Sequence, residues 1–293
     1  QLLVAYYVIL FALYGMYRRF PKKIWGYMLF VSAAFLIVLC GAKTRDIEGI
    51  KITVLDVGQG DGIVLSGKGK NYLIDGGSSD VKQAGAQRIE PYLLSEGIGC
   101  LDYVFVTHGD EDHISGLKEL LLQGKLTQIK VRTVVFSAYV FQDAALAELE
   151  AVIRAAGITI VWMREGDVIG DDTFTLTCLH PTAEYRAKDK NAASLALAYH
   201  SDTFDMLFTG DMDADAVADM DIQQDYDCIK LPHHGSKYSY VEGIYAHADY
   251  GLISCGYNNR YGHPHTEVLQ GLAQEGTKVL RTDEMGAVVF RGR

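Results

Sequence analysis

Residues 107–113 read Thr-His-Gly-Asp-Glu-Asp-His, and they directly follow the apolar run Tyr-Val-Phe-Val at 103–106. A run of this kind predicts a buried strand, and α/β folds place their ligand sites at strand ends. Gly109 permits the tight turn that would bring the neighbouring side chains together. The side chains of metal-ligating type are His108, Asp110, Asp112 and His113. Carboxylates this close repel one another unless a cation lies between them, so a metal site is favoured over a solvated acidic turn.

Three later segments also carry a potential ligand at or near the end of an apolar run. Residues 207–211 (Leu-Phe-Thr-Gly-Asp) end in Asp211, residues 231–236 contain the adjacent pair His233 and His234, and residues 261–265 read Tyr-Gly-His-Pro-His. Each motif alone is weak evidence for a metal site. Gly-Asp is an ordinary turn sequence, and a single histidine has a structural role as often as it binds a metal. Adjacent histidines rarely both point into one site, so one is expected to be a ligand and the other to support it.

Two glycine-rich turns precede these motifs. Residues 71–77 (Asn-Tyr-Leu-Ile-Asp-Gly-Gly) place Asp75 at a strand end, and residues 56–62 (Asp-Val-Gly-Gln-Gly-Asp-Gly) look loosely like a phosphate cradle. The second turn is not a Walker motif, because Gly-Lys-Ser/Thr is absent. It is not a dinucleotide fingerprint either, because no helix precedes the next strand.

The composition limits the class of protein. Of 293 residues, 49% are hydrophobic and 22% charged, which excludes disorder. The formal charge of −10 means that a nucleic-acid partner would need a local basic strip or bound cations. The five cysteines stand singly, and their odd number excludes a complete disulfide framework.

From residue 50 the pattern is that of an α/β domain, in which short β-type runs alternate with helical stretches. Strands are expected at 52–57, 62–65, 71–74, 103–107, 133–136, 173–179, 194–199, 206–208, 228–230, 250–254 and 287–290. Helices are expected at 89–96, 116–124, 144–156, 213–220 and 266–275. Residues 185–193 read as a loop.

The first 40 residues differ from the rest. Two uncharged apolar runs, 2–17 and 24–40, flank a loop with four Lys and Arg residues. We expect residues 1–44 to form two transmembrane helices and 45–293 a separate α/β domain, although a buried helical hairpin would give a similar pattern. The basic loop is then cytoplasmic and the domain extracytoplasmic. Because the chain begins with Gln, it is expected to be part of a longer protein.

The order of these motifs resembles the metallo-β-lactamase superfamily, and more closely the ComEC family of DNA-internalisation channel proteins of competence. The similarity is to the C-terminal domain of that family and covers residues 50–293. The matching segments are 55–61, 107–113, 191–197, 209–211, 233–236 and 261–264. It implies a four-layer αββα metallo-β-lactamase fold, preceded by the last two transmembrane helices of the channel.

The resemblance also implies two divalent metal ions between two β-sheets. The ligands carried over are His108 and Asp110 for one ion, Asp112 and His113 for the other, Asp211 as a bridge and His234 as the late ligand. Asp110 stands where the superfamily commonly has histidine, Asn191 and His180 are the two candidates for the middle ligand, and His233 is the alternative to His234. An oxygen-rich set favours manganese, with zinc possible.

The remaining site residues are assigned by the chemistry expected around the metals. His263 is the candidate general acid, and Asp61 and Asp75 are counted with the catalytic site. The resemblance implies that Asp75 supports the metal ligands. Candidates to bind phosphate are Gly58, Gln59, Gly60, Ser236 and Lys237. No organic cofactor is expected.

The sequence thus predicts a metal-dependent phosphodiesterase, the nuclease domain of a membrane DNA-uptake channel. By resemblance it degrades the non-transported strand during natural competence, outside the bacterial cytoplasmic membrane. The expected partners are single-stranded DNA, the lipid bilayer and other DNA-uptake proteins. The alternatives are a hydrolase of the same fold for another phosphoester, or a non-catalytic docking or gating module of the channel.

Overall fold

A computed structural model gives the structure of the chain, and the residues that it describes are 7, 8, 10, 11, 14, 15, 31, 32, 35, 36, 49–122, 129–139, 143–220, 222 and 224–292. The chain divides into two compact units, Gln1–Asp46 and Ile47–Arg293. The predicted transmembrane runs 2–17 and 24–40 lie largely outside the described residues. Within the described part, no helix has the length and apolar character needed to cross a bilayer.

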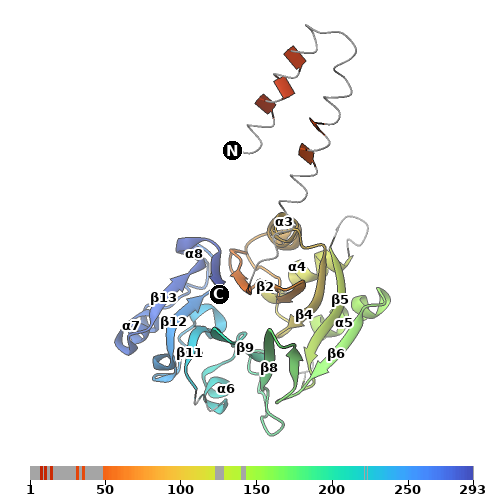
Figure 1. Ribbon diagram of the computed structural model, residues 1–293. Helices are drawn as coiled ribbons and strands as arrows, with labels where there is room; N and C mark the ends of the chain where they lie inside the picture. The colour runs from red at the N-terminus through yellow and green to blue at the C-terminus, as the bar shows by residue number, and fades with distance from the viewer. Residues whose placement is uncertain are drawn as a thin grey trace. The chain divides into compact units, whose positions relative to one another are not determined.

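The second unit contains two mixed β-sheets, each with seven strands among the described residues (Figure 1). The first has the order β14 (Val288–Arg291), β1 (Lys51–Val54), β2 (Ile63–Gly67), β3 (Lys70–Ile74), β4 (Cys100–Val106), β5 (Lys130–Ser137) and β6 (Thr159–Met163). The second has the order β13 (Lys278–Arg281), β12 (Ala248–Ile253), β11 (Tyr226–Lys230), β10 (Phe204–Phe208), β9 (Ala196–Ser201), β8 (Phe174–His180) and β7 (Val168–Gly170).

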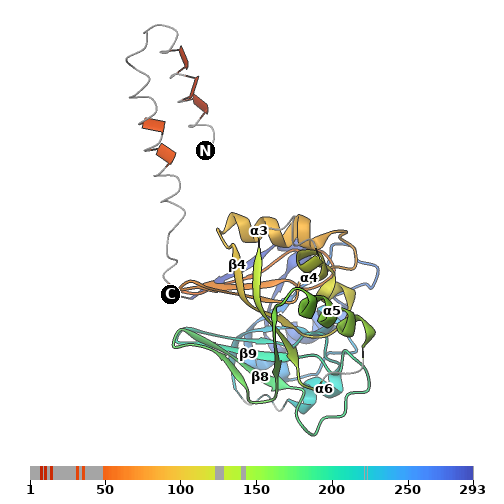
Figure 2. The same cartoon turned by 90° about the vertical axis from the view of Figure 1, so that its right-hand side faces the viewer.

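Helices cover the outer face of each sheet, as Figures 1 and 2 show. The segments that accompany the first sheet are η1 (Gly85–Ile89), α3 (Glu90–Ser95), α4 (Glu111–Leu122) and α5 (Ala144–Ala155). Those that accompany the second are α6 (Ala214–Asp219), η2 (Pro232–Gly235), η3 (Ile244–His247), α7 (Thr266–Glu275) and α8 (Thr282–Met285). Local signals set their ends: Asp143 caps α5 by accepting the N–H of Ala145 at 2.7 Å, and Gly276 ends α7 with a φ of +80°.

The main core lies between the two sheets. In β8, Phe174, Leu176 and Cys178 are buried while the residues between them are half-buried, because successive side chains of a strand point to opposite faces. In β4, Phe105 packs into this inter-sheet core, and Val104 and Val106 pack into a second core under the helices. Helices outside and sheets inside give the four layers that the sequence predicted.

The strand directions repeat between the sheets. The run β3-β4-β5-β6 is parallel in the first sheet, and β10-β11-β12-β13 is parallel in the second. Parallel strands present their carboxyl ends at one edge. The loops that follow β3, β4, β10 and β11 therefore meet, and these loops carry the polar motifs of the sequence.

Candidate metal centre

The stretch 107–113 joins β4 to α4. Only its first four residues form the turn, because α4 begins at Glu111 and the N–H of His113 already bonds to the carbonyl of Asp110 at 2.9 Å. Gly109 is required by close packing: a Cβ there would lie 2.9 Å from Leu146 and closer still to the carboxylate of Asp143. The helix thus begins about five residues earlier than expected, and its first turn directs Asp112 and His113 into the site.

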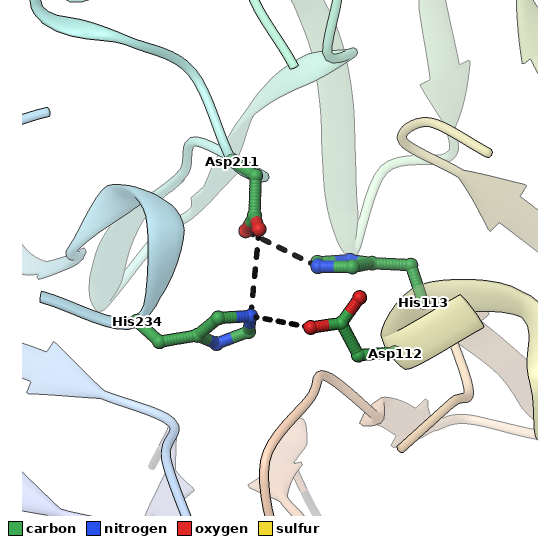
Figure 3. A group of neighbouring side chains, drawn as sticks. All are labelled: Asp112, His113, Asp211 and His234. Atoms are coloured by element: carbon green, nitrogen blue, oxygen red, sulfur yellow. Dashed lines mark ion pairs between the residues drawn. The ribbon is translucent and has the colours of Figure 1, made fainter. Parts of the chain in front are cut away.

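Four side chains from three separate segments converge beside this turn (Figure 3). They are Asp112, His113, Asp211 and His234, and their ligand atoms all lie within 4.8 Å of one another. We call them the four-residue group. Asp211 Oδ1 is 3.1 Å from His113 Nε2, Asp211 Oδ2 is 3.4 Å from His234 Nε2, and Asp112 Oδ2 is 3.5 Å from the same nitrogen.

The atoms that face the centre of this group have no hydrogen-bond partner. They are His113 Nε2, His234 Nε2 and Asp211 Oδ1, and all three are buried. Buried polar atoms are nearly always satisfied, so three orphaned atoms at one point indicate a missing partner. A divalent cation suits carboxylate oxygens and imidazole nitrogens, and the residues present therefore fit a metal ion.

The other nitrogen of each histidine is held in place. His113 Nδ1 lies 2.8 Å from Asp75 Oδ2, and His234 Nδ1 lies 2.8 Å from the carbonyl of Ser254. Asp75 also accepts the N–H and the hydroxyl of Thr107, at 2.8 and 2.7 Å. These bonds fix the rings so that Nε2 points into the group, the usual arrangement around ligating histidines.

A tight turn presents the late histidine. His233 and His234 have φ values of +49° and +56°, in the left-handed region that non-glycine residues rarely adopt, and Gly235 follows at +80°. The turn sends His234 into the four-residue group. His233 stays on the cavity wall, with Nε2 3.9 Å from Asp211 Oδ2.

The charges in the group stabilise one another. Burial opposes the charged form of Asp211, but His113 and His234 outweigh it and hold its pKa well below its usual range. Burial likewise opposes the charged form of His234, yet Asp211 and Asp112 raise its pKa to about 10. Both shifts show how strongly the clustered carboxylates favour positive charge at this point.

A buried lysine lies beneath the group. Lys230 is 1% exposed, with Nζ 2.5 Å from Asp61 Oδ2 and 3.9 Å from Asp211 Oδ1, and it donates to the carbonyl of Gly210. Burial disfavours its charge, but Asp61 and Asp211 leave its pKa raised. Asp61, Asp75 and His113 also lie close enough to hold an ion, but the ammonium group of Lys230 already neutralises Asp61.

His108 and Asp110 lie beside the four-residue group. His108 Nε2 is buried without a hydrogen-bond partner, 3.6 Å from Asp110 Oδ2 and 3.9 Å from Asp211 Oδ2. Asp110 forms an ion pair with Lys190. Burial raises the pKa of Asp110, but His108 and Lys190 lower it to about 2. These two residues offer a partial second site in which a lysine already neutralises one ligand.

The less certain ligands are placed as follows. His180 is buried, with Nδ1 3.1 Å from the carbonyl of Ser194, and it is in neither candidate metal group among the described residues. Asn191 accepts the N–H of Ser194 on its carbonyl.

An open cavity of about 290 Å³ borders the group. Asp112, Asp211 and His234 form part of its wall, and His263 and Arg260 form another part. Burial, and the nearby His234 and His233, lower the pKa of His263 to about 4, so this ring is largely neutral at pH 7. The sequence reasoning did not select Arg260, although the Asn-Asn-Arg-Tyr segment at 258–261 does carry a basic residue beside an aromatic one.

The expected phosphate cradle is already engaged within the protein. The N–H groups of Gly58 and Gln59 donate to Asp56 and Asp80, and the carbonyl of Gly60 accepts the hydroxyl of Ser254. The side chain of Gln59 does line the cavity, and its buried Nε2 has no hydrogen-bond partner.

Two further phosphate candidates lie away from the cavity wall. Ser236 is buried, and its hydroxyl accepts the N–H of Tyr238 at 3.4 Å. Lys237 Nζ pairs with Glu267 at 3.2 Å. Neither residue is among those that line the cavity.

Comparison with protein families matches residues 55–183 to the metallo-β-lactamase superfamily. Among solved structures, the metallo-β-lactamase fold protein YhfI from Bacillus subtilis is similar with a TM-score of 0.52 and 14% identity, over 84% of this chain and 100% of that one. The domain therefore has the α/β metallo-β-lactamase fold that the sequence predicted.

The sequence relatives are competence proteins. ComE operon protein 3 of Bacillus subtilis (strain 168) is 31% identical over 260 residues, 82% of this chain and 33% of the relative. Competence protein ComA of Neisseria gonorrhoeae is 27% identical over 246 residues, 82% of this chain and 32% of the relative. The resemblance to the ComEC family is thereby confirmed, and the chain spans about a third of the length of these relatives. Fold and relatives together support a competence-related, metal-dependent hydrolase domain.

Proposed function

We propose that the domain is a metal-dependent phosphodiesterase that acts as a nuclease on DNA, degrading the non-transported strand during natural competence. The observation that carries the proposal is the four-residue group, whose orphaned, buried ligand atoms border an open cavity. Similarity to competence proteins supports DNA as the substrate.

The proposed ligands already point toward one another, so they could bind a metal ion without changing their orientation. A bound divalent ion would supply positive charge opposite the phosphoryl oxygens and would lower the pKa of water at the site. Asp75 and the carbonyl of Ser254 keep Nε2 of His113 and of His234 directed inward. Preorganised ligands of this kind need no reorientation when substrate enters.

Two residues of the cavity wall, Arg260 and His263, could interact with the negative charge of a phosphodiester. Arg260 remains protonated at any relevant pH and can pair with a phosphate. Without substrate, His263 is largely neutral at pH 7, because its pKa is about 4. A phosphodiester anion beside it favours the imidazolium and raises this pKa. In that state His263 can donate a proton to the leaving oxygen.

Two ions remain our proposal, with manganese favoured over zinc because carboxylates contribute half of the four-residue group. The four-residue group would hold one ion. His108 and Asp110, with Asp211 between the two positions, would hold the other. Asn191 and His180 are the alternative candidates for the middle ligand, and His233 is the alternative to His234 as the late ligand.

The cellular setting is also a proposal. The two uncharged runs that flank the basic loop support an anchor in the bacterial cytoplasmic membrane, with the hydrolase domain outside. Other DNA-uptake proteins are the proposed partners, in line with the competence relatives.

The function is tested by incubating the 293-residue chain with end-labelled single-stranded DNA and manganese. We expect Asp112→Asn to reduce cleavage by at least about 100-fold. Mutating the groups that hydrogen-bond to metal ligands typically lowers activity by about 10- to 100-fold, and replacing a ligand itself should lower it further. Asp215→Asn is the matched control: this exposed carboxylate also stands in the first turn of a helix and pairs with Lys188.

Unchanged cleavage by Asp112→Asn would reject the site. Testing bis-p-nitrophenyl phosphate, RNA and a β-lactam in parallel separates DNA from other substrates of this fold. Stoichiometric metal with no turnover of any substrate would favour a docking or gating module instead.

A further inference from the structure

A row of four aromatic rings runs from the cavity onto the surface. Its members are Tyr261, His263, His265 and Tyr238, and we call it the ring row. Tyr261 and His263 stack with centroids 5.7 Å apart and planes 21° apart. His265 continues the row at 5.0 Å from His263, and Tyr238 follows at 6.2 Å from His265.

A cation lies over each end of the ring row. The guanidinium of Arg260 is 4.8 Å from the ring centroid of Tyr261, and Nζ of Lys237 is 5.7 Å from that of Tyr238. At the inner end, Arg260 and Tyr261 border the cavity. At the outer end, Tyr238 is 73% exposed. Two of the four rings, Tyr261 and Tyr238, are exposed, and exposed apolar groups of this kind are typical of a binding surface.

The two segments that form the row are fixed to each other. The N–H of His265 donates to the carbonyl of Gly235 at 3.1 Å, and the N–H of Lys237 donates to His265 Nδ1 at 3.2 Å. A Cβ on Gly235 would lie 2.7 Å from Pro264, so the two loops approach as closely as glycine allows. Such a surface loses little freedom when it binds a partner.

We propose that the ring row is a binding site for single-stranded nucleic acid, along which the strand passes into the cavity. Unpaired bases stack on aromatic rings whatever their sequence, whereas the faces of bases in a duplex are occupied by their neighbours. The two cations can contact phosphates along the strand. On a chain of net charge −10 these cations provide local attraction for a polyanion.

The outer cation is available for this role. Lys237 pairs with Glu267, but the pair is exposed, with side chains 40% and 60% accessible, and exposed pairs are weak. A phosphate can therefore take the place of the Glu267 carboxylate as the ionic partner of Lys237. The passage of a strand toward a reaction centre rests on the proposed function, but binding by the ring row does not require turnover.

Fluorescence anisotropy with a labelled oligo-dT tests binding separately from hydrolysis. With the 293-residue chain in chelator, we expect Tyr238→Ala to weaken binding about tenfold, because stacking on an aromatic ring contributes strongly to single-strand affinity. Tyr238→Phe, which keeps the ring, should bind like the unaltered chain. Lys237→Ala should lower the dependence of log K on log salt by about 0.7.

The matched control is another lysine over a tyrosine. Lys278 Nζ lies 5.4 Å from the ring of Tyr250, on β13 and β12, away from the ring row, and Tyr250→Ala should leave affinity unchanged. Equal affinity of Tyr238→Ala and the unaltered chain, or equal affinity for duplex and single strand, would overturn the inference. Hydrolysis of bis-p-nitrophenyl phosphate with manganese is followed in parallel: its absence would count against the proposed function without affecting the binding result.

Discussion

At the scale of single residues, Lys190 is the feature that most distinguishes the two halves of the metal centre. Its ammonium group pairs with Asp110 and lies 3.8 Å from Asp143. In the four-residue group the lysine nearest to Asp211 is Lys230, which pairs mainly with Asp61, and three buried atoms at the centre have no hydrogen-bond partner. The two positions should therefore bind metal with unequal affinity.

This difference predicts a metal-binding experiment. Manganese titration followed by calorimetry should show one tight and one weak site, and Lys190→Met should tighten the weak site by about tenfold because a competing charge is removed. Lys188→Met is the control, since Lys188 pairs with Asp213 and Asp215 on the surface. Identical weak-site affinities in Lys190→Met and the unaltered chain would contradict the prediction.

At the scale of elements, the strand-end loops set the site, and in the turn before α4 a glycine packs closely against neighbouring side chains. Gly109→Ala should destabilise the domain by about 1–3 kcal/mol, because the added methyl group overlaps Leu146 and the carboxylate of Asp143. Gly99→Ala is the control, because no atom lies within 4 Å of a Cβ at that position. Urea unfolding gives the free energy of unfolding of both variants. Equal midpoints would contradict the prediction, because they would show that the turn adjusts to the added methyl group.

The strands that the sequence left out are all edge strands. The predicted set did not include β6, β7 and β13, and each of them lies at an edge of its sheet. In β6, Thr159 and Trp162 are exposed, and in β13 Lys278 is exposed while the other residues are half-buried. The apolar run at 160–163 (Ile-Val-Trp-Met) is a signal that could have predicted β6, whereas β13 (Lys-Val-Leu-Arg) is short and has only two apolar residues.

At the scale of the whole molecule, Lys230 connects the two sheets. It lies at the end of β11 in the second sheet, and its partner Asp61 lies in the loop between β1 and β2 of the first. Both side chains are almost completely buried. Removing Lys230 alone would deprive the buried carboxylate of Asp61 of its ammonium partner and leave it only the more distant histidine nitrogens, at 3.8 Å.

This buried pair gives a prediction about stability. Lys230→Met should cost about 3–5 kcal/mol, the usual effect of leaving a buried charge without its partner. The double variant Lys230→Met with Asp61→Leu should recover much of that loss, since no charge remains buried without a partner. Lys118→Met, which removes a partly exposed lysine from a surface pair with Glu111, serves as the control. A small loss for Lys230→Met in chemical denaturation would argue against the pair as a link between sheets.

The sequence by itself determined the fold class and most of the metal-centre candidates. Apolar runs mark buried strands, and Asp75, His108, Asp211 and His234 all stand at or just beyond their ends. Strands and their ends can be predicted locally, because apolar runs and turn residues are patterns of neighbours in the chain. The order of the motifs added the family.

Only the tertiary structure decided which of these residues share a site and what accompanies them. The four-residue group draws its members from three segments that are remote in the sequence, and Lys190, Lys230 and Arg260 join the site through contacts that no sequence period encodes. The ring row likewise exists only because the turn after β11 packs against the loop before α7. Distances between side chains that are remote in sequence are set by how the sheets pack, and the physical chemistry of the site depends on those distances.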